Sequence, residues 1–272
     1  PEYANVTPYA IYADLLDKGI YLASVSTMYR LLRERGLLHH RGESRPAQRR
    51  SKPPELKATG PNQVWSWDVT WLPTRVQGIF LFAYVLMDVW SRKIVGWEIH
   101  TEESEAHAHA FFRRVAAEHD VSGVHLHSDN GNAMKGVTIL VLFFALGIIP
   151  SYSRPRVSND NAYSEALFKT LKYTPGYPKR FMDIAHARTW FADFAHWYNT
   201  EHRHSGIGYV TPEARHSGRV PTIMRRRNEV LAEARNARPE RWPNGQSRWK
   251  EDPVAYLNPD PETRESLMRK TA

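Results

Sequence analysis

Cysteine is absent from the 272-residue chain. Its absence excludes disulfides and cysteine-containing zinc sites, and it fits a protein of the reducing cytosol. The longest apolar stretch, residues 137–150, is too short to span a membrane and is interrupted by Gly147. No signal peptide is recognisable, and the chain begins at Pro1 without methionine, so we expect a cytoplasmic location and a longer parent protein.

The chain has fewer acidic than basic residues. Lysine and arginine number 37 against 29 aspartates and glutamates, which gives a net charge of +8 and a sequence pI near 9.6. This balance favours a polyanionic partner such as DNA or RNA, although composition alone is equally compatible with a merely basic soluble protein. The length and the 42% hydrophobic content suffice for one large core plus one or two small modules.

Residues 1–40 predict two short helices. Thr7–Pro8 is typical of an N-cap followed by proline at the first helical position, and the second helix is expected to begin at Ser24 or Ser26. Because this second helix carries Arg30 and Arg33, the pair resembles a helix-turn-helix DNA-binding module, with a plain helical hairpin as the alternative. The apolar residues of the second helix expected to face inward are Val25, Met28, Tyr29, Leu31 and Leu32.

Residues 41–60 predict an extended basic linker, because prolines and cations dominate the stretch and little in it can be buried. Arg49 and Arg50 are candidate contacts to DNA phosphates. A solvated tether that touches nothing is the alternative.

Residues 216–272 predict a basic C-terminal helix followed by an extended tail. The helix contains three consecutive arginines, Arg225, Arg226 and Arg227. Such a run is often only a solvated face, but in a protein that binds nucleic acid it is a candidate phosphate contact.

The intervening residues 61–215 predict a mixed α/β core. Aromatic and β-branched runs indicate strands, and apolar residues at helical spacing indicate helices. The expected strands are residues 65–72, 79–88, 93–100, 124–127 and 148–152. The expected helices are residues 104–119, 133–146, 161–171 and 183–201. The order predicts a five-stranded mixed sheet flanked by helices.

Three carboxylates in this core stand where a metal ligand is better accommodated than a surface charge. Asp68 lies inside the strand-like run Val64–Trp71, Asp129 ends an apolar run, and Glu165 opens an apolar helix pattern. Carboxylates that converge from two strand ends and a helix can hold two Mg²⁺ ions about 3.5–4 Å apart, the arrangement used for in-line phosphoryl transfer.

Each of these acids also has an ordinary explanation. Asp68 could cap a turn, Asp129 stands in a common turn sequence, and Glu165 could complement a helix dipole. Asp160 is a rival for the third position, although its surroundings are more typical of a helix cap. Asp88 is better explained by a structural or supporting role.

Four segments in order resemble the motifs of a known family. Residues 67–70, 127–131 and 161–172 are similar to the catalytic motifs of DDE transposases. Residues 197–212 contain the Tyr-Asn, Arg, His-Ser and Thr-Pro pairs typical of bacterial insertion-sequence transposases of the IS-three type, relatives of retroviral integrases. The resemblance covers about residues 5–215.

The resemblance implies a ribonuclease-H-like core in which Asp68, Asp129 and Glu165 are the catalytic, metal-binding residues. It also implies two Mg²⁺ ions per site, with Mn²⁺ as a substitute. Lys172 matches the basic residue that follows the glutamate in this family and is a candidate DNA contact.

Arg203 and His204 lie in the fourth segment and are further candidate DNA contacts, with capping of the last core helix as the alternative for His204. The expected partners are transposon ends and target DNA, with a homo-oligomer in the synaptic complex and no membrane. Family members usually have a further N-terminal helix-turn-helix and a zipper-like segment, so we expect an upstream part of the protein.

The function implied by the resemblance is DNA transposition in the bacterial cytoplasm, by metal-dependent strand cleavage and transfer to a 3′-OH end. A ribonuclease-H-like nuclease and a non-catalytic DNA-binding relative are the alternatives. The nuclease would not need the fourth segment, and the non-catalytic relative is expected to lack one of the three acids.

Overall fold

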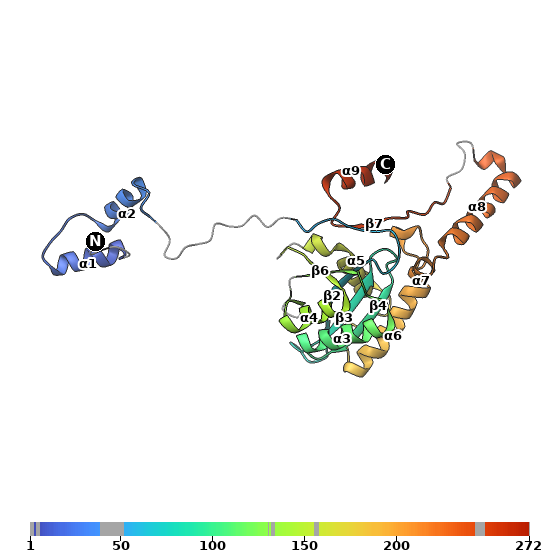
Figure 1. Ribbon diagram of the computed structural model, residues 1–272, viewed down its shortest axis with the longest axis horizontal. Helices are drawn as coiled ribbons and strands as arrows, with labels where there is room; N and C mark the ends of the chain where they lie inside the picture. Colours follow the sequence, from blue (N-terminus) through green and yellow to red (C-terminus); the bar gives the residue numbers. More distant parts are fainter. Residues whose placement is uncertain are drawn as a thin grey trace. The chain divides into compact units, whose positions relative to one another are not determined.

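The computed structural model describes residue 3 and residues 6–38, 52–129, 131, 134–154, 158–242 and 248–271 (Figure 1). It divides into two compact units, Pro1–Arg50 and Ser51–Ala272. The predicted phosphate contacts Arg49 and Arg50 lie outside the described residues. Within the described residues, no helix is both long and apolar enough to cross a membrane.

The first unit contains the two predicted helices, α1 (Pro8–Asp17) and α2 (Val25–Glu34). Thr7 and Ser24 cap them, as their sequence positions predict: each side-chain oxygen accepts the backbone N–H three residues later, both at 3.3 Å.

The inward face predicted for α2 is not buried in this unit. Leu31 is exposed and the other four predicted residues are only half-buried, while α1 buries no more than Pro8 and Leu15. Two helices of ten residues each have too little surface to enclose a core between them. The prediction of an enclosed apolar face was therefore wrong for these helices taken alone.

The second unit is built on a five-stranded sheet, as predicted. Its strands are β2 (Val64–Pro73), β3 (Phe80–Asp88), β4 (Ile94–His100), β5 (His125–Ser128) and β6 (Ile149–Tyr152). They lie in the order β4-β3-β2-β5-β6. Strand β3 is antiparallel to both β2 and β4, whereas β5 runs parallel to β2 and β6 parallel to β5. This is the mixed sheet of a ribonuclease-H-like fold.

Helices cover both faces of this sheet. The helices of the second unit are α3 (Glu105–Glu118), α4 (Val137–Leu146), α5 (Ala162–Tyr173), α6 (Ile184–Thr200), α7 (Pro212–His216), α8 (Val220–Ala237) and α9 (Pro261–Thr271). Because side chains alternate along a strand, Trp65 and Trp67 of β2 pack with α3 and α4, whereas Leu72 packs with α5 and α6. The even-numbered residues of β2, Asp68 among them, therefore belong to the α5 face.

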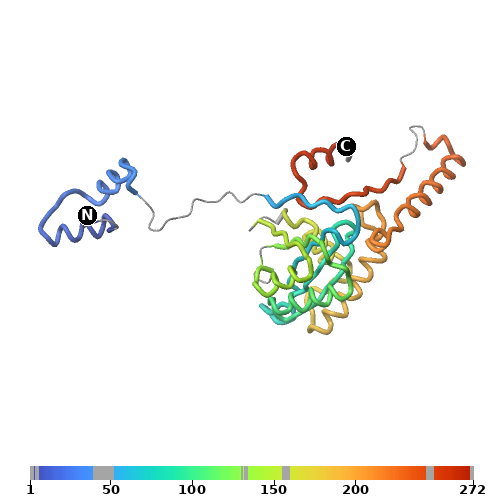
Figure 2. The backbone as a smooth tube through the Cα atoms, viewed as in Figure 1, coloured from blue at the N-terminus to red at the C-terminus, as the bar shows by residue number. Residues whose placement is uncertain are grey.

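The C-terminal tail folds back onto the core instead of extending away from it. Strand β7 (Ala255–Leu257) pairs antiparallel with β1 (Leu56–Ala58), so two short runs from the predicted tail and the predicted linker form a second sheet. Figure 2 shows the C-terminal segment, in red, running beside the blue segment that leads into the sheet. The indole N–H of Trp90 donates to the Pro253 carbonyl at 2.9 Å and fastens the tail further.

A small apolar core lies under this second sheet, so the prediction of an extended tail was wrong for these residues. Alternate residues of both runs are apolar and buried, and they pack with Val64, Val89 and Trp90. A run of three residues is too short for its periodicity to identify a strand. The partner strand lies about two hundred residues away, so the sequence around each run does not indicate the pairing either.

Leu257→Ala is expected to lower the free energy of unfolding by about 2 kcal/mol, since it removes a buried side chain from this small core. Val230→Ala, on an exposed position of α8, should change it by less than about 0.5 kcal/mol. Urea unfolding followed by circular dichroism measures both, and equal unfolding midpoints for Leu257→Ala and the unchanged protein would mean that the tail is not packed.

Candidate active site

Asp68 and Asp129 are brought together by the pairing of two parallel strands. Ser66 of β2 pairs with His127 of β5, and continuing this register by two residues places Asp129 beside Asp68. Asp129 follows directly after β5, where the chain leaves the sheet. One of its carboxylate oxygens, Oδ1, accepts the Gly131 backbone N–H at 2.9 Å, so a local turn orients the side chain.

Glu165 stands in the first turn of α5, and a buried hydroxyl holds that turn against β2. Ser66 Oγ donates to Asn161 Oδ1 at 2.6 Å and lies 2.6 Å from Ser164 Oγ. Since the single hydroxyl proton of Ser66 is engaged by Asn161, Ser164 is the donor in the second bond. The Asn161 amide also donates to the carbonyl of Trp67 at 3.1 Å.

We call Ser66, Asn161 and Ser164 the β2–α5 clasp. All three side chains are buried, so their hydrogen bonds do not compete with water. Ser66 lies two residues before Asp68, and Ser164 immediately precedes Glu165. The clasp therefore fixes the strand that carries the first acid to the helix that carries the third.

The acids of this region act on one another electrostatically. Asp68 is half-buried, and burial followed by the charges of Asp129 and Glu165 raises its pKa to about 7, against the opposing effect of the hydrogen bond from the Val69 N–H. The carboxylates thus lie close enough to repel, in a place where Asp68 is poorly solvated.

Glu103 is a fourth acid of this region that the sequence did not single out. Its charge contributes to the raised pKa of Asp68, and its own pKa is raised by burial and by the charge of Asp129. In the sequence it looks like an ordinary acid just before helix α3, and only the strand order of the folded sheet places it near Asp129.

A divalent cation fits this set of side chains. Among the described residues, no three side chains of histidine, aspartate or glutamate form a ready-made metal cluster. Asp68, Asp129 and Glu165 nevertheless offer only oxygen donors, which Mg²⁺ prefers, and their repulsion is what a bound cation would relieve. These three residues are the ones that would hold it.

The rival acids are occupied elsewhere. Asp160, only 2% exposed, accepts the backbone N–H and two guanidinium N–H groups of Arg154 at 2.9–3.0 Å. Asp88 is fully buried and accepts from the backbone of Asn62 and from Ser91. Both carboxylates are saturated by structural hydrogen bonds, which removes Asp160 as a candidate for the third position and agrees with the structural role expected of Asp88.

The basic residues predicted to contact DNA differ in their exposure and in the partners they have in the structure. Lys172 is exposed in the last turn of α5, and Arg203 is exposed after α6. Arg30 and Arg33 are exposed on α2, where Arg30 forms an ion pair with Glu34 at 3.4 Å.

On α8, Arg225 is exposed, and Arg226 lies 3.7 Å from Glu229. The structure gives Arg227 a structural role, because its guanidinium donates to the carbonyls of Gly208 and Tyr209, both at 2.7 Å, and stacks on the Trp249 ring.

His204 caps a turn of 3-10 helix, where its Nδ1 accepts the Gly206 backbone N–H at 3.1 Å. Burial, and then the positive charges of Arg92 and two further residues, lower the pKa of His204 to about 4. The ring is therefore neutral near pH 7, and it caps this separate turn instead of the last core helix, which was the alternative expected.

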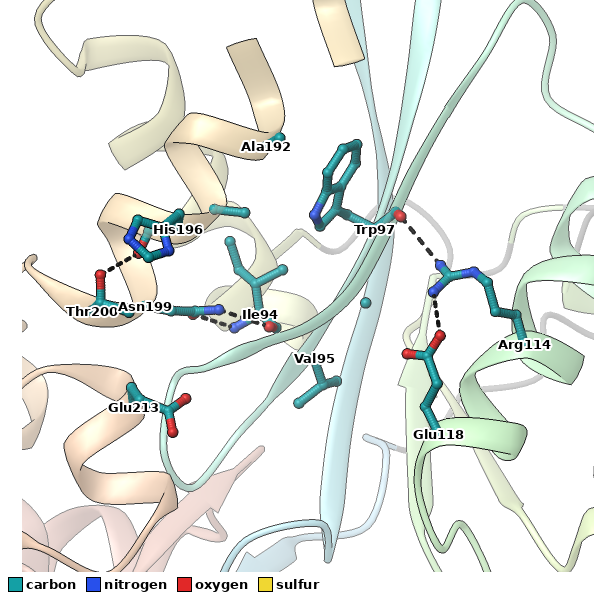
Figure 3. Close-up of a pocket in the computed structure, with 12 residues that line it drawn as sticks. Ile94, Val95, Trp97, Arg114, Glu118, Ala192, His196, Asn199, Thr200 and Glu213 are labelled. Atoms are coloured by element: carbon teal, nitrogen blue, oxygen red, sulfur yellow. Dashed lines mark hydrogen bonds and ion pairs between the residues drawn. The ribbon is translucent and has the colours of Figure 1, made fainter. Parts of the chain in front are cut away.

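The Tyr-Asn segment also has a structural explanation. Figure 3 shows Asn199 of α6 turned toward edge strand β4, where its amide accepts the N–H of Ile94 at 2.9 Å and donates to the carbonyl of the same residue at 3.0 Å. The cavity around it, of about 480 Å³, contains none of the three acids. Asn199 thus covers an open sheet edge that would otherwise be free to pair.

Comparison with protein families finds the Integrase core domain twice, over residues 58–158 and over residues 146–212. The two matches together span more than half of the chain. They contain all three acids, the β2–α5 clasp and the Tyr-Asn segment.

Two curated relatives illustrate the similarity. The transposase for insertion sequence element IS904 of Lactococcus lactis is 33% identical over 166 residues, which is 58% of this chain and 62% of the relative. Transposase InsF for insertion sequence IS3A of Escherichia coli is 26% identical over 209 residues, which is 71% of this chain and 70% of the relative. The chain thus spans less than two thirds of the first relative.

Similar solved structures include the catalytic core domain of HTLV-2 integrase in complex with magnesium, with 18% identity and a TM-score of 0.42 over 58% of this chain and 97% of that one. A chain of the simian T-cell lymphotropic virus intasome gives 18% identity and a TM-score of 0.46 over 75% of this chain and 70% of that one.

Two isosteric substitutions at pH 8 should change stability in opposite directions in the metal-free protein. Asp68→Asn removes a poorly solvated charge whose pKa is raised, so charging it costs stability as the pH rises toward 7 and above. Asp160→Asn removes a charge whose pKa Arg154 holds low, so its contribution is present at pH 8 and is lost as the pH falls.

We expect the melting temperature in EDTA to rise by at least about 2–4 °C for Asp68→Asn, the shift that corresponds to 1 kcal/mol in a domain of this size, and to fall for Asp160→Asn. Differential scanning calorimetry measures both. A lower melting temperature for Asp68→Asn would contradict the repulsion among the acids.

Proposed function

The chain belongs to the integrase core family, with transposases of bacterial insertion sequences among its relatives, and on that premise we propose that it is a DNA transposase of an insertion sequence. Its reaction is metal-dependent strand cleavage followed by transfer of a 3′-OH end into target DNA. The observation that supports the proposal most is the convergence of Asp68, Asp129 and Glu165, whose charges act together on the pKa of Asp68.

The three carboxylates position the reaction and need not move protons. Asp68 is mounted on a central strand, Asp129 on the end of the neighbouring strand, and Glu165 on a helix that the clasp fixes. Two Mg²⁺ ions, with Mn²⁺ as a substitute, would supply charge neutralisation at the phosphodiester and a more acidic attacking hydroxyl. Catalysis of this kind consists mostly of positioning and electrostatic stabilisation.

Exposed cations of both units bind DNA in this proposal. Lys172 lies seven residues after Glu165 on the same helix, two turns further along and on nearly the same face, so it is placed to contact a phosphate beside the carboxylates. Arg203, Arg225 and the exposed arginines of α2 add positive charge for the same backbone. We propose that the protein acts on DNA as a homo-oligomer in the bacterial cytoplasm.

Asp68→Asn, Asp129→Asn and Glu165→Gln should each reduce transfer of a labelled 3′-OH DNA end in Mg²⁺ by at least about 100-fold. DNA binding in EDTA should be largely unchanged, because the acids hold cations and not DNA. Glu118→Gln, an exposed acid on α3, is the matched control and should keep full activity. Substantial metal-dependent joining by Asp68→Asn would overturn the assignment.

The same assay separates the alternatives. Joining supports a transposase, cutting without joining indicates a nuclease, and neither activity indicates a DNA-binding protein without catalysis.

Ser66→Ala tests the clasp. Losing the hydroxyl frees the first turn of α5, and a misplacement of Glu165 by about 1 Å is expected to slow strand transfer by about 10–100-fold at saturating DNA. DNA affinity should not change. Thr189→Ala removes an exposed hydroxyl from α6 and serves as control. If Ser66→Ala lost activity only through weaker DNA binding, the clasp would have no positioning role.

A further inference from the structure

A cavity of about 690 Å³ lies on the flank of helix α5, away from the three acids. Its walls come from α5, from the turn between β3 and β4, and from the returning C-terminal tail with the start of α9. On α5 the cavity is lined by Ala162, Tyr163, Ala166 and Leu167. At 100° per residue this side is well separated from Glu165, so the cavity is not part of the carboxylate site.

Arg92 contributes a buried positive charge to the wall of this cavity. It is only 9% exposed, its guanidinium stacks 4.0 Å above the Tyr163 ring, and one of its N–H groups donates to the carbonyl of Val89. Within the described part of the chain, no carboxylate forms an ion pair with it. Burying a charge without an ionic partner costs free energy. An anion bound from solution would offset this cost.

The positive charge of Arg92 lowers the pKa values of neighbouring residues. It lowers the pKa of Arg215, for which burial is the larger cause, and it lowers the pKa of His204 in the same way. It also opposes the rise in the pKa of Tyr198 that burial produces. Two buried guanidinium groups thus share this region of the protein.

The rest of the cavity wall offers donors and positive charge. Asn258 is 6% exposed, and its amide nitrogen finds no hydrogen-bond acceptor among the residues that the structure describes. Because Nδ1 of His204 accepts a hydrogen bond, its neutral ring carries the proton on Nε2. Lys52 and Arg264 add two cations, and the carboxylate of Asp160 on this wall is already used by Arg154.

We propose that this cavity, the Arg92 pocket, binds a phosphate group of a nucleic-acid strand. A phosphate supplies negative charge and several acceptor oxygens to a wall of donors, and the volume leaves room for the attached sugar. The choice of a DNA strand over a free phosphate ligand rests on the proposed function. A strand bound here would brace α5 from the side opposite to Glu165.

Thermal unfolding in EDTA tests the pocket with inorganic phosphate and with deoxyadenosine monophosphate, each against chloride at equal ionic strength. We expect the melting temperature of the unchanged protein to rise by about 2–4 °C near tenfold saturation. Arg92→Met should lose this rise, yet melt in chloride at the same or a higher temperature, because it removes an uncompensated charge. Lys179→Met, an exposed loop cation outside the pocket, should keep the rise.

A second variant keeps the test decisive if Arg92→Met folds poorly. Asn258→Asp places a carboxylate beside the cations, and the left-handed backbone at this position, with φ 55°, is tolerated by aspartate. The Asn258→Asp variant should have a higher melting temperature in chloride than the unchanged protein, and phosphate should not raise it further. No phosphate response in the unchanged protein, or an equal response in Arg92→Met, would overturn the pocket.

Fluorescence anisotropy with a short DNA strand in EDTA separates the two sources of phosphate. Arg92→Met should weaken DNA binding about tenfold, the effect of losing a charge-assisted contact. A phosphate response with unchanged DNA affinity would overturn the assignment to a strand. Failure of the proposed function stays distinguishable, because Asp68→Asn should lose strand transfer while it keeps the phosphate response.

Discussion

One buried hydroxyl holds the two halves of the candidate active site together. Ser66 Oγ joins Asn161 and Ser164, so the first turn of α5 is fixed to the central strand of the sheet. The acids themselves cannot provide this order, because burial and then the repulsion between their charges raise the pKa of Asp68. Hydrogen bonds between neutral side chains, one or two residues from Asp68 and Glu165, therefore hold the repelling carboxylates in place.

Much of this arrangement was predictable from local sequence. Strand and helix patterns identified the five-stranded sheet and its flanking helices. The local settings of Asp68, Asp129 and Glu165 left ordinary explanations open, and the family resemblance singled them out. Their convergence was not a local property. It follows from the parallel register of β2 and β5 and from the packing of α5, and both depend on contacts between residues far apart in the chain.

The contributions that the sequence did not reveal share the same cause. Asn199 looked like part of a motif, and its role at the edge of β4 needed the folded strand. Nothing in the sequence indicated that Arg92 is buried, and the cavity it lines is formed by elements far apart in the chain, α5 and the returning C-terminal tail among them. The tail itself was predicted as extended because β7 is three residues long and finds β1 across nearly the whole chain.

The central claim is that three carboxylates from three elements converge on one site, where they would hold two divalent cations. With Fe²⁺ in place of Mg²⁺, hydrogen peroxide is reduced at the bound metal to hydroxyl radicals, which cut the polypeptide nearby, and ascorbate returns the Fe³⁺ to Fe²⁺. The account predicts cleavage at three places in one chain, near Asp68, Asp129 and Glu165, with competition by Mg²⁺ and loss of all three in Asp68→Asn. Cleavage near only one of the acids, or cleavage unchanged by Asp68→Asn, would contradict it.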